Sequence, residues 1–60
     1  MDVKIVEAST ETIVIIYPVV LNAQNYKPSE NEYFNEAWRC AVEDKLVTPD
    51  RRNEYRIAFL

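Results

Sequence analysis

The ten residues from Thr12 to Leu21, TIVIIYPVVL, form an apolar run that constrains the fold more than any other feature. A membrane-spanning helix takes about 20 residues, so the run is too short to cross a bilayer. Pro18 would interrupt a helix, and the β-branched isoleucines and valines favour an extended chain. The run therefore predicts a strand, although it lacks the polar alternation of a strand with one face in water.

Both faces of this predicted strand are apolar. Side chains alternate along a strand, so Ile13, Ile15 and Tyr17 are expected on one face. Val14 and Ile16 are then expected on the other, and either face could meet a helix. A chain of 60 residues has one predicted helix and little else to cover the second face. We therefore expect a second copy of the chain to cover it, by face or edge packing, which predicts a homodimer.

The segments around the run predict a hairpin. Asp2 to Glu7 alternates in part, which suits a strand with one face more buried than the other. The chain contains no glycine, so Ala8 to Glu11 is expected to form a looser loop instead of a tight turn. Pro18 cannot donate to a neighbouring strand and belongs on an edge, at a bulge or beyond regular pairing. In the loop that follows, Asn22 and Asn25 are expected to take left-handed conformations in place of glycine.

An amphipathic helix is predicted after Ser29. The segment SENE, Ser29 to Glu32, has the spacing of a capping box. Apolar residues then recur at the helical spacing and define one stripe: Phe34, Ala37, Trp38, Ala41 and Val42. Charged residues fall on the opposite side, where Arg39 is spaced to pair with Glu36 and Glu43.

Thr48-Pro49 predicts the end of this helix, near Leu46 or Val47, because the residue before proline disfavours helical angles. The same pair suits the start of a short second turn, with Thr48 as N-cap and Pro49 at N1. Tyr55 to Leu60 alternates with a period of two, which favours a strand over a continued helix. Together these segments predict one small α+β domain over residues 1–60: β-β-α-β, with one amphipathic helix on a two- to three-stranded antiparallel sheet.

Composition argues against catalysis and against bound cofactors. The chain has no histidine, no glycine and one cysteine, Cys40, which excludes an internal disulfide, a glycine-rich phosphate loop and an ordinary zinc site. The carboxylates fall mainly on the polar side of the helix, where water screens them. We expect no enzyme activity and no cofactor or metal. The first residues lack a signal-peptide pattern, so we expect a cytoplasmic protein with a reduced thiol.

The leading hypothesis is a small acidic accessory or regulatory protein that binds another protein as a homodimer. The candidate interaction residues are Val14 and Ile16 on the apolar strand, Tyr26 in the loop and Tyr33 on the shoulder of the helical stripe. Trp38 is assigned to the core. Tyrosine and tryptophan are common in interface hot spots, which motivates the aromatic candidates.

The alternative hypothesis is a small DNA-binding accessory protein. Arg51, Arg52 and Arg56 form the basic cluster of the sequence and could contact phosphates together with the helix. The competing interpretation is a solvated turn in which these arginines pair with Asp50 and Glu54. The net charge of -3 and the acidic helix would repel phosphate, so nucleic acid is the less favoured partner, and no membrane binding is expected.

Overall fold

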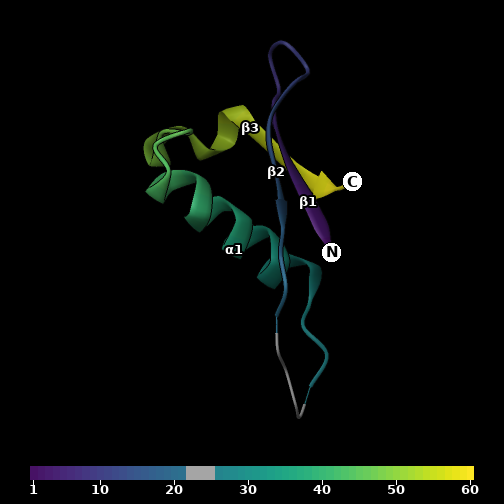
Figure 1. Ribbon diagram of the computed structural model, residues 1–60. Helices are drawn as coiled ribbons and strands as arrows, with labels where there is room; N and C mark the ends of the chain where they lie inside the picture. The colour runs from purple at the N-terminus through teal and green to yellow at the C-terminus, as the bar shows by residue number, and fades with distance from the viewer. Residues whose placement is uncertain (22–25) are drawn as a thin grey trace.

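The computed structural model describes residues 1–21 and 26–60, so the expectation for Asn22 and Asn25 lies outside the described residues. Five elements follow one another along the chain (Figure 1): β1 (Asp2–Glu7), β2 (Thr12–Pro18), α1 (Glu30–Glu43), the 3-10 helix η1 (Pro49–Glu54) and β3 (Tyr55–Phe59). The predicted α+β class and its β-β-α-β order are confirmed, with η1 inserted before the last strand. The C-terminal segment is a strand and not a continued helix.

The sheet has three antiparallel strands in the order β2-β1-β3, so the first strand lies in the middle. Its register places apolar residues opposite one another on one face. The aligned residues are Val3 with Tyr17 and Phe59, and Ile5 with Ile15 and Ile57. Because direct neighbours share a face, these side chains form two apolar rows across all three strands.

Helix α1 covers this face of the sheet, as Figure 1 shows. Ala37 and Ala41 are fully buried in one cluster with Val3 and Ile5, and their small side chains let the helix approach the sheet closely. Val19 and Val47 complete the buried cluster. The predicted stripe is confirmed, since Phe34, Trp38 and Val42 pack partly buried against the same core.

The helix begins as predicted and ends earlier. Ser29 is the N-cap of a capping box, and its backbone N–H donates to the Glu32 carboxylate at 3.0 Å. The last helical residue is Glu43, so the expectation of an end near Leu46 or Val47 is wrong by about one turn. The chain leaves the helix there, and Val47 beyond it returns to the core, where it is 7% exposed.

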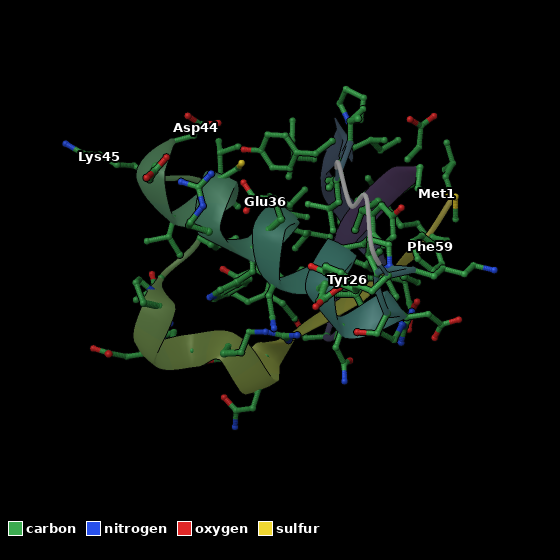
Figure 2. All side chains as sticks on the ribbon, turned by 90° about the horizontal axis from the view of Figure 1, so that it is seen from below. Met1, Tyr26, Glu36, Asp44, Lys45 and Phe59 are labelled. Atoms are coloured by element: carbon green, nitrogen blue, oxygen red, sulfur yellow. The ribbon has the colours of Figure 1, made fainter. Side chains whose placement is uncertain are left out.

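A left-handed residue makes this early exit possible. Lys45 has φ 60°, and its N–H donates to the Val42 carbonyl at 3.1 Å. The Leu46 N–H donates to the Ala41 carbonyl at 2.9 Å, which completes a Schellman motif. The exposed Lys45 side chain points away from the rest of the protein (Figure 2). Glycine is the usual residue at this position, but this chain has none.

Two further connections match the predictions. Ala8 to Glu11 joins β1 to β2 as a loop of four residues, in which Glu11 has φ 57°. The Thr10 N–H donates to the Glu7 carbonyl at 3.3 Å and closes the turn. Thr48 is the N-cap of η1 and Pro49 opens it. No helix in the described ranges has the length and apolar character needed to cross a membrane.

Candidate interaction surfaces

The face of the sheet opposite the helix is not covered by any described element. Lys4, Val6, Ile13, Ile16, Arg56 and Ala58 lie on this open face, as the alternation from the buried residues of β1 requires. Ile13 is 49% exposed and Ile16 is 39% exposed, whereas Val6, opposite Ile13 on β1, is only 4% exposed. The open face is therefore only partly apolar, because Lys4 lies on the central strand and Arg56 lies beside Val6.

A β-bulge changes which side chains of β2 lie on this face. The register with β1 shifts between Ile5 and Val6, so that Ile15 lies opposite Ile5 while Ile13 lies opposite Val6. Val14 is the extra residue and packs partly buried against the core. Strict alternation would group Ile13 with Ile15 and Val14 with Ile16, and that grouping is wrong because the bulge breaks the period of two. Of these two candidates, Ile16 is on the open face and Val14 is not.

Aromatic side chains gather between α1 and β3. The Tyr33 and Phe59 rings meet edge to face at 5.8 Å between centroids, and Phe34 lies 4.8 Å from Phe59. Further along, the Trp38 and Tyr55 rings are 5.4 Å apart. All five side chains are half-buried and pack against the core, so Tyr33 combines a core contact with partial exposure.

The three arginines of the basic cluster each have a partner in the chain. The Arg52 guanidinium lies over the Trp38 ring, 5.0 Å from its centroid. Arg51 Nε is 3.6 Å from a Glu54 carboxylate oxygen, in agreement with the interpretation as a self-paired turn.

Arg56 reaches across the sheet from β3 to the hairpin loop. Its guanidinium pairs with Glu11, with Nη1 donating to Oε1 at 3.2 Å. The hydrogen bond and the charge of Arg56 lower the pKa of the Glu11 carboxyl below its ordinary value. Each of the three arginines is therefore oriented by a different neighbour within the chain.

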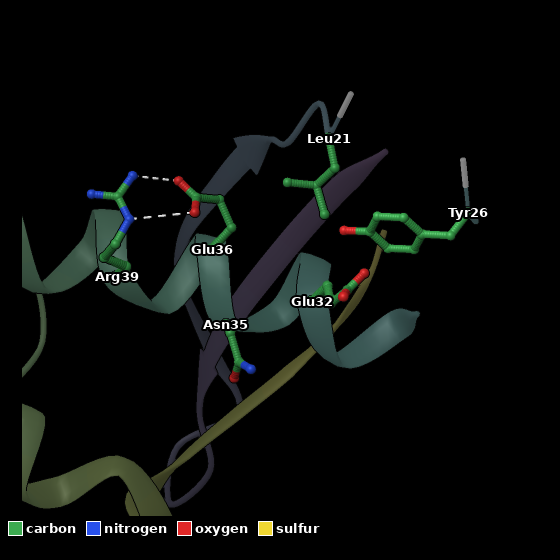
Figure 3. Close-up of a pocket in the computed structure, with 6 residues that line it drawn as sticks. All are labelled: Leu21, Tyr26, Glu32, Asn35, Glu36 and Arg39. Carbon is green, nitrogen blue, oxygen red and sulfur yellow. Dashed lines mark hydrogen bonds and ion pairs between the residues drawn. The ribbon is translucent and has the colours of Figure 1, made fainter. Parts of the chain in front are cut away.

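A hollow of about 400 Å³ lies beside the first turns of α1, next to the loop that precedes the helix (Figure 3). Its lining residues are Leu21, Tyr26, Glu32, Asn35, Glu36 and Arg39. Tyr26 is 63% exposed and points its ring over the hollow. The two carboxylates are already engaged, since Glu32 accepts from the Ser29 N–H and Glu36 from Arg39.

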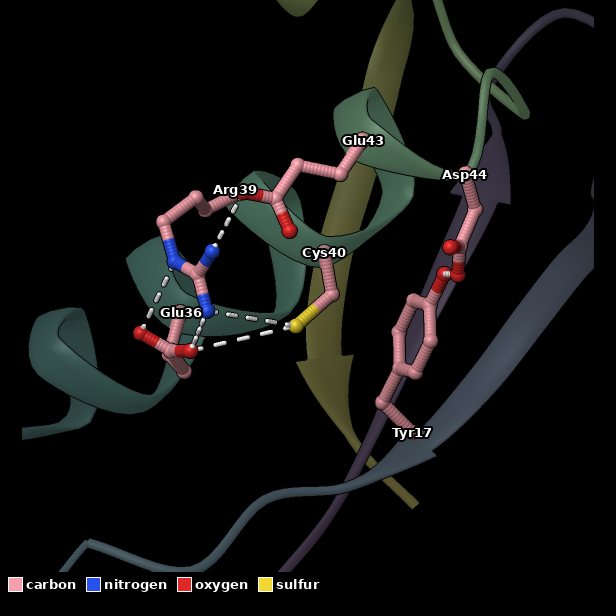
Figure 4. A network of polar contacts seen from close by, with 6 residues as sticks. All are labelled: Tyr17, Glu36, Arg39, Cys40, Glu43 and Asp44. Atoms are coloured by element: carbon pink, nitrogen blue, oxygen red, sulfur yellow. Dashed lines mark hydrogen bonds and ion pairs between the residues drawn. The ribbon is translucent and has the colours of Figure 1, made fainter.

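The polar residues of the last helical turns form two separate contacts (Figure 4). Arg39 pairs with both Glu36 and Glu43, as its spacing predicts, and donates to Glu43 at 2.7 Å. On the other side of the helix end, the Tyr17 hydroxyl donates to Asp44 Oδ2 at 2.6 Å. Burial, and then this hydrogen bond, raise the pKa of Tyr17 to about 12.

Cys40 lies within the first of these contacts, 3.8 Å from both the Arg39 guanidinium and the Glu36 carboxylate. Burial raises the pKa of its thiol above the ordinary value, and the arginine beside it only partly opposes this. A nucleophilic cysteine needs a lowered pKa, so the arrangement does not activate it. Among the described residues, no group of three or more potential ligands could hold a metal ion.

Comparison of the chain with protein-family models, with curated proteins and with solved structures finds no match. Its function is therefore inferred from the chemistry and geometry of its own residues.

Proposed function

We propose that this protein is a small acidic, non-enzymatic interaction protein that acts as a homodimer, in an accessory or regulatory role. The observation that carries the proposal is the sheet itself: one helix covers one face, while Ile13 and Ile16 on the other face are 49% and 39% exposed. Burying one large aliphatic side chain contributes about 1.5–3 kcal/mol, so a binding partner would gain by covering such surface. A lone unpaired thiol suits the reducing cytoplasm proposed for it.

The size of the chain supports self-association as well. A domain of about 60 residues buries only about 60% of the surface that its unfolded chain exposes, and its stability is correspondingly small. Disulfides, metals and oligomerisation are the usual additions. With one cysteine and no histidine, this chain cannot form an internal disulfide and lacks the usual zinc ligands, which favours oligomerisation.

Sedimentation equilibrium on the wild-type protein tests the proposal. We expect association at roughly 100 µM, where a complex with a micromolar dissociation constant is largely formed. A folded monomer at that concentration would contradict the homodimer.

The DNA-binding alternative predicts a salt-dependent mobility shift with duplex DNA that the variant Arg51→Ala/Arg52→Ala loses. The partners of these arginines within the chain favour the interaction protein over this alternative. Absence of a shift at low salt is the result that we expect.

A further inference from the structure

We infer that two copies of this chain pair antiparallel through the free edge of β3, so that two sheets become one sheet of six strands. This inference rests on the proposed homodimer and names its contact. It follows from three features of β3 and its surroundings. These are free backbone groups on its outer edge, a neighbouring row of half-buried aromatic side chains, and opposite charges on the elements beside its two ends, the start of α1 and η1.

The backbone of β3 presents hydrogen-bonding groups to its free edge. The Leu60 N–H donates to Asp2 and the Ala8 N–H donates to Glu54, both at 3.0 Å, so residues 54 and 60 face β1. Successive residues of a strand direct their N–H and C=O groups to opposite sides. Ile57 and Phe59 therefore point theirs away from β1, toward the edge. Tyr55 does too, but its N–H bonds to the Arg52 carbonyl and its carbonyl accepts from Arg52 Nη1.

The opposite edge of the sheet is protected. Val19 exchanges hydrogen bonds with Met1 at 2.9 and 3.0 Å, so by the same alternation Pro18 points away from β1. Proline has no N–H, and it therefore removes a donor from this edge. The bulge at Val14 distorts the same strand, and bulges and prolines are the usual means of blocking edge pairing. Among the described strands, β3 therefore has the unprotected edge, and two-fold pairing through this edge gives a closed pair and not a filament.

The register of the pair follows from the free groups. If Ala58 of one copy lies opposite Ala58 of the other, Ile57 of each lies opposite Phe59 of its partner. All the free N–H and C=O groups of these two residues are then used. The small Ala58 side chains meet on the open face, and Ile57 and Phe59 extend the apolar rows of the core across the junction. No like charges lie directly opposite one another in β3.

Charge complementarity favours a second copy as the occupant. Tyr33 and Phe34 contact Phe59, and Trp38 contacts Tyr55, so α1 runs antiparallel to β3. Antiparallel pairing of β3 then places the start of α1 in one copy beside η1 of the other. The first turn of α1 carries Glu30 and Glu32. η1 carries Arg51 and Arg52 beside its own Asp50 and Glu54, so the glutamates of the other copy would add to the ion pair that Arg51 makes with Glu54. Two-fold symmetry makes this favourable contact twice.

The half-buried aromatic side chains supply apolar area to the same contact. Tyr33, Phe34, Trp38, Tyr55 and Phe59 lie along the β3 side of the helix, with Arg52 over the Trp38 ring. Aromatic residues and arginine are enriched at protein interfaces. The pairing also places both open faces on the same side of the joined sheet, because the two-fold axis is perpendicular to it. Ile13 and Ile16 then stay available to a further partner.

The decisive experiment removes one outward N–H by chemical synthesis. Methylation of the Ile57 amide nitrogen keeps the side chain and should weaken the dimer by about tenfold or more, since symmetry removes two hydrogen bonds at once. Methylation of the Ile16 amide, an outward N–H on the protected edge, is the matched control and should leave the dimer unchanged. Sedimentation equilibrium measures the dimer dissociation constant of both methylated chains, and circular dichroism checks that each is folded.

The edge contact, but not the homodimer, would be overturned by either of two results. The chain methylated at Ile57 could dimerise as strongly as the wild type, or the chain methylated at Ile16 could lose the dimer. A wild-type monomer would overturn both. If the methylated chain unfolds, a charge swap between η1 and the start of α1 tests the same contact. Arg51→Glu and Glu30→Lys should each weaken the dimer, and the double variant should restore it. No restoration would overturn the edge contact.

Discussion

At the scale of single residues, the absence of glycine leaves Glu11 and Lys45 in left-handed conformations, with φ 57° and 60°. A left-handed conformation costs a residue with a Cβ atom roughly 1–2 kcal/mol. Both residues are held in place by their surroundings: Glu11 by the ion pair with Arg56, and Lys45 by the Schellman hydrogen bonds.

Lys45→Gly should therefore stabilise the fold by about 0.5–1 kcal/mol, because glycine adopts this conformation freely and its greater entropy in the unfolded chain offsets only part of the gain. The denaturant midpoint measures the change. Lys45→Ala, which keeps the Cβ atom, should show no such increase. If both variants match the wild type, the left-handed residue carries no strain.

At the scale of elements, the helix is fixed at its start by the sequence immediately around it. The Ser29–Glu32 capping box satisfies orphan donors of the first turn, and the alanines at 37 and 41 bring the helix onto Val3 and Ile5. The strands depend on one another instead: β1 pairs with both neighbours, and the bulge at Val14 sets which residues of β2 face the helix.

Ser29→Ala should lower the free energy of unfolding by about 1 kcal/mol, the usual effect of losing an N-cap. Ser29→Asp should retain most of the stability, since a carboxylate also caps a helix and favours the positive end of its dipole. Urea denaturation followed by circular dichroism compares the three proteins. Equal midpoints for serine and alanine would contradict the role of the capping box.

At the scale of the whole molecule, the Tyr17–Asp44 hydrogen bond joins the edge strand β2 to the C-cap of α1, 27 residues apart in sequence. The raised pKa of Tyr17, about 12 against an ordinary value of 10.0, has a defined consequence for stability. The folded state favours the protonated phenol. The contribution of the protonated Tyr17 phenol to the free energy of unfolding is therefore complete below about pH 10. It is lost as the pH rises through about 12.

We expect the wild type to lose stability more steeply than Tyr17→Phe between about pH 10 and 12. Denaturant midpoints across this range measure the difference, and ultraviolet absorbance follows the phenolate directly. Asp44→Asn, which removes the charge but keeps an acceptor, should lower the pKa of Tyr17 only in part, because burial is the larger cause. Parallel pH profiles for the wild type and Tyr17→Phe would contradict the coupling.

The sequence by itself determined the features that depend on near neighbours. Spacing within a few residues predicts four of these features: the capping box at Ser29, the helical stripe through Ala37 and Trp38, the loop over Ala8 to Glu11, and the strand from Tyr55. The α+β class followed from their order. Local hydrogen bonding and side-chain periodicity suffice for such features, because their partners lie close by in the chain.

Only the tertiary structure decided how these elements combine. The bulge at Val14 arises from pairing with β1 and places that side chain on the core side, away from Ile16, with which it was expected to share a face. The helix ends at Glu43 because a left-handed Lys45 directs the chain back so that Val47 is buried. The order β2-β1-β3 makes Pro18 an edge residue and leaves β3 free. Each of these depends on contacts between segments distant in sequence, which no local pattern encodes.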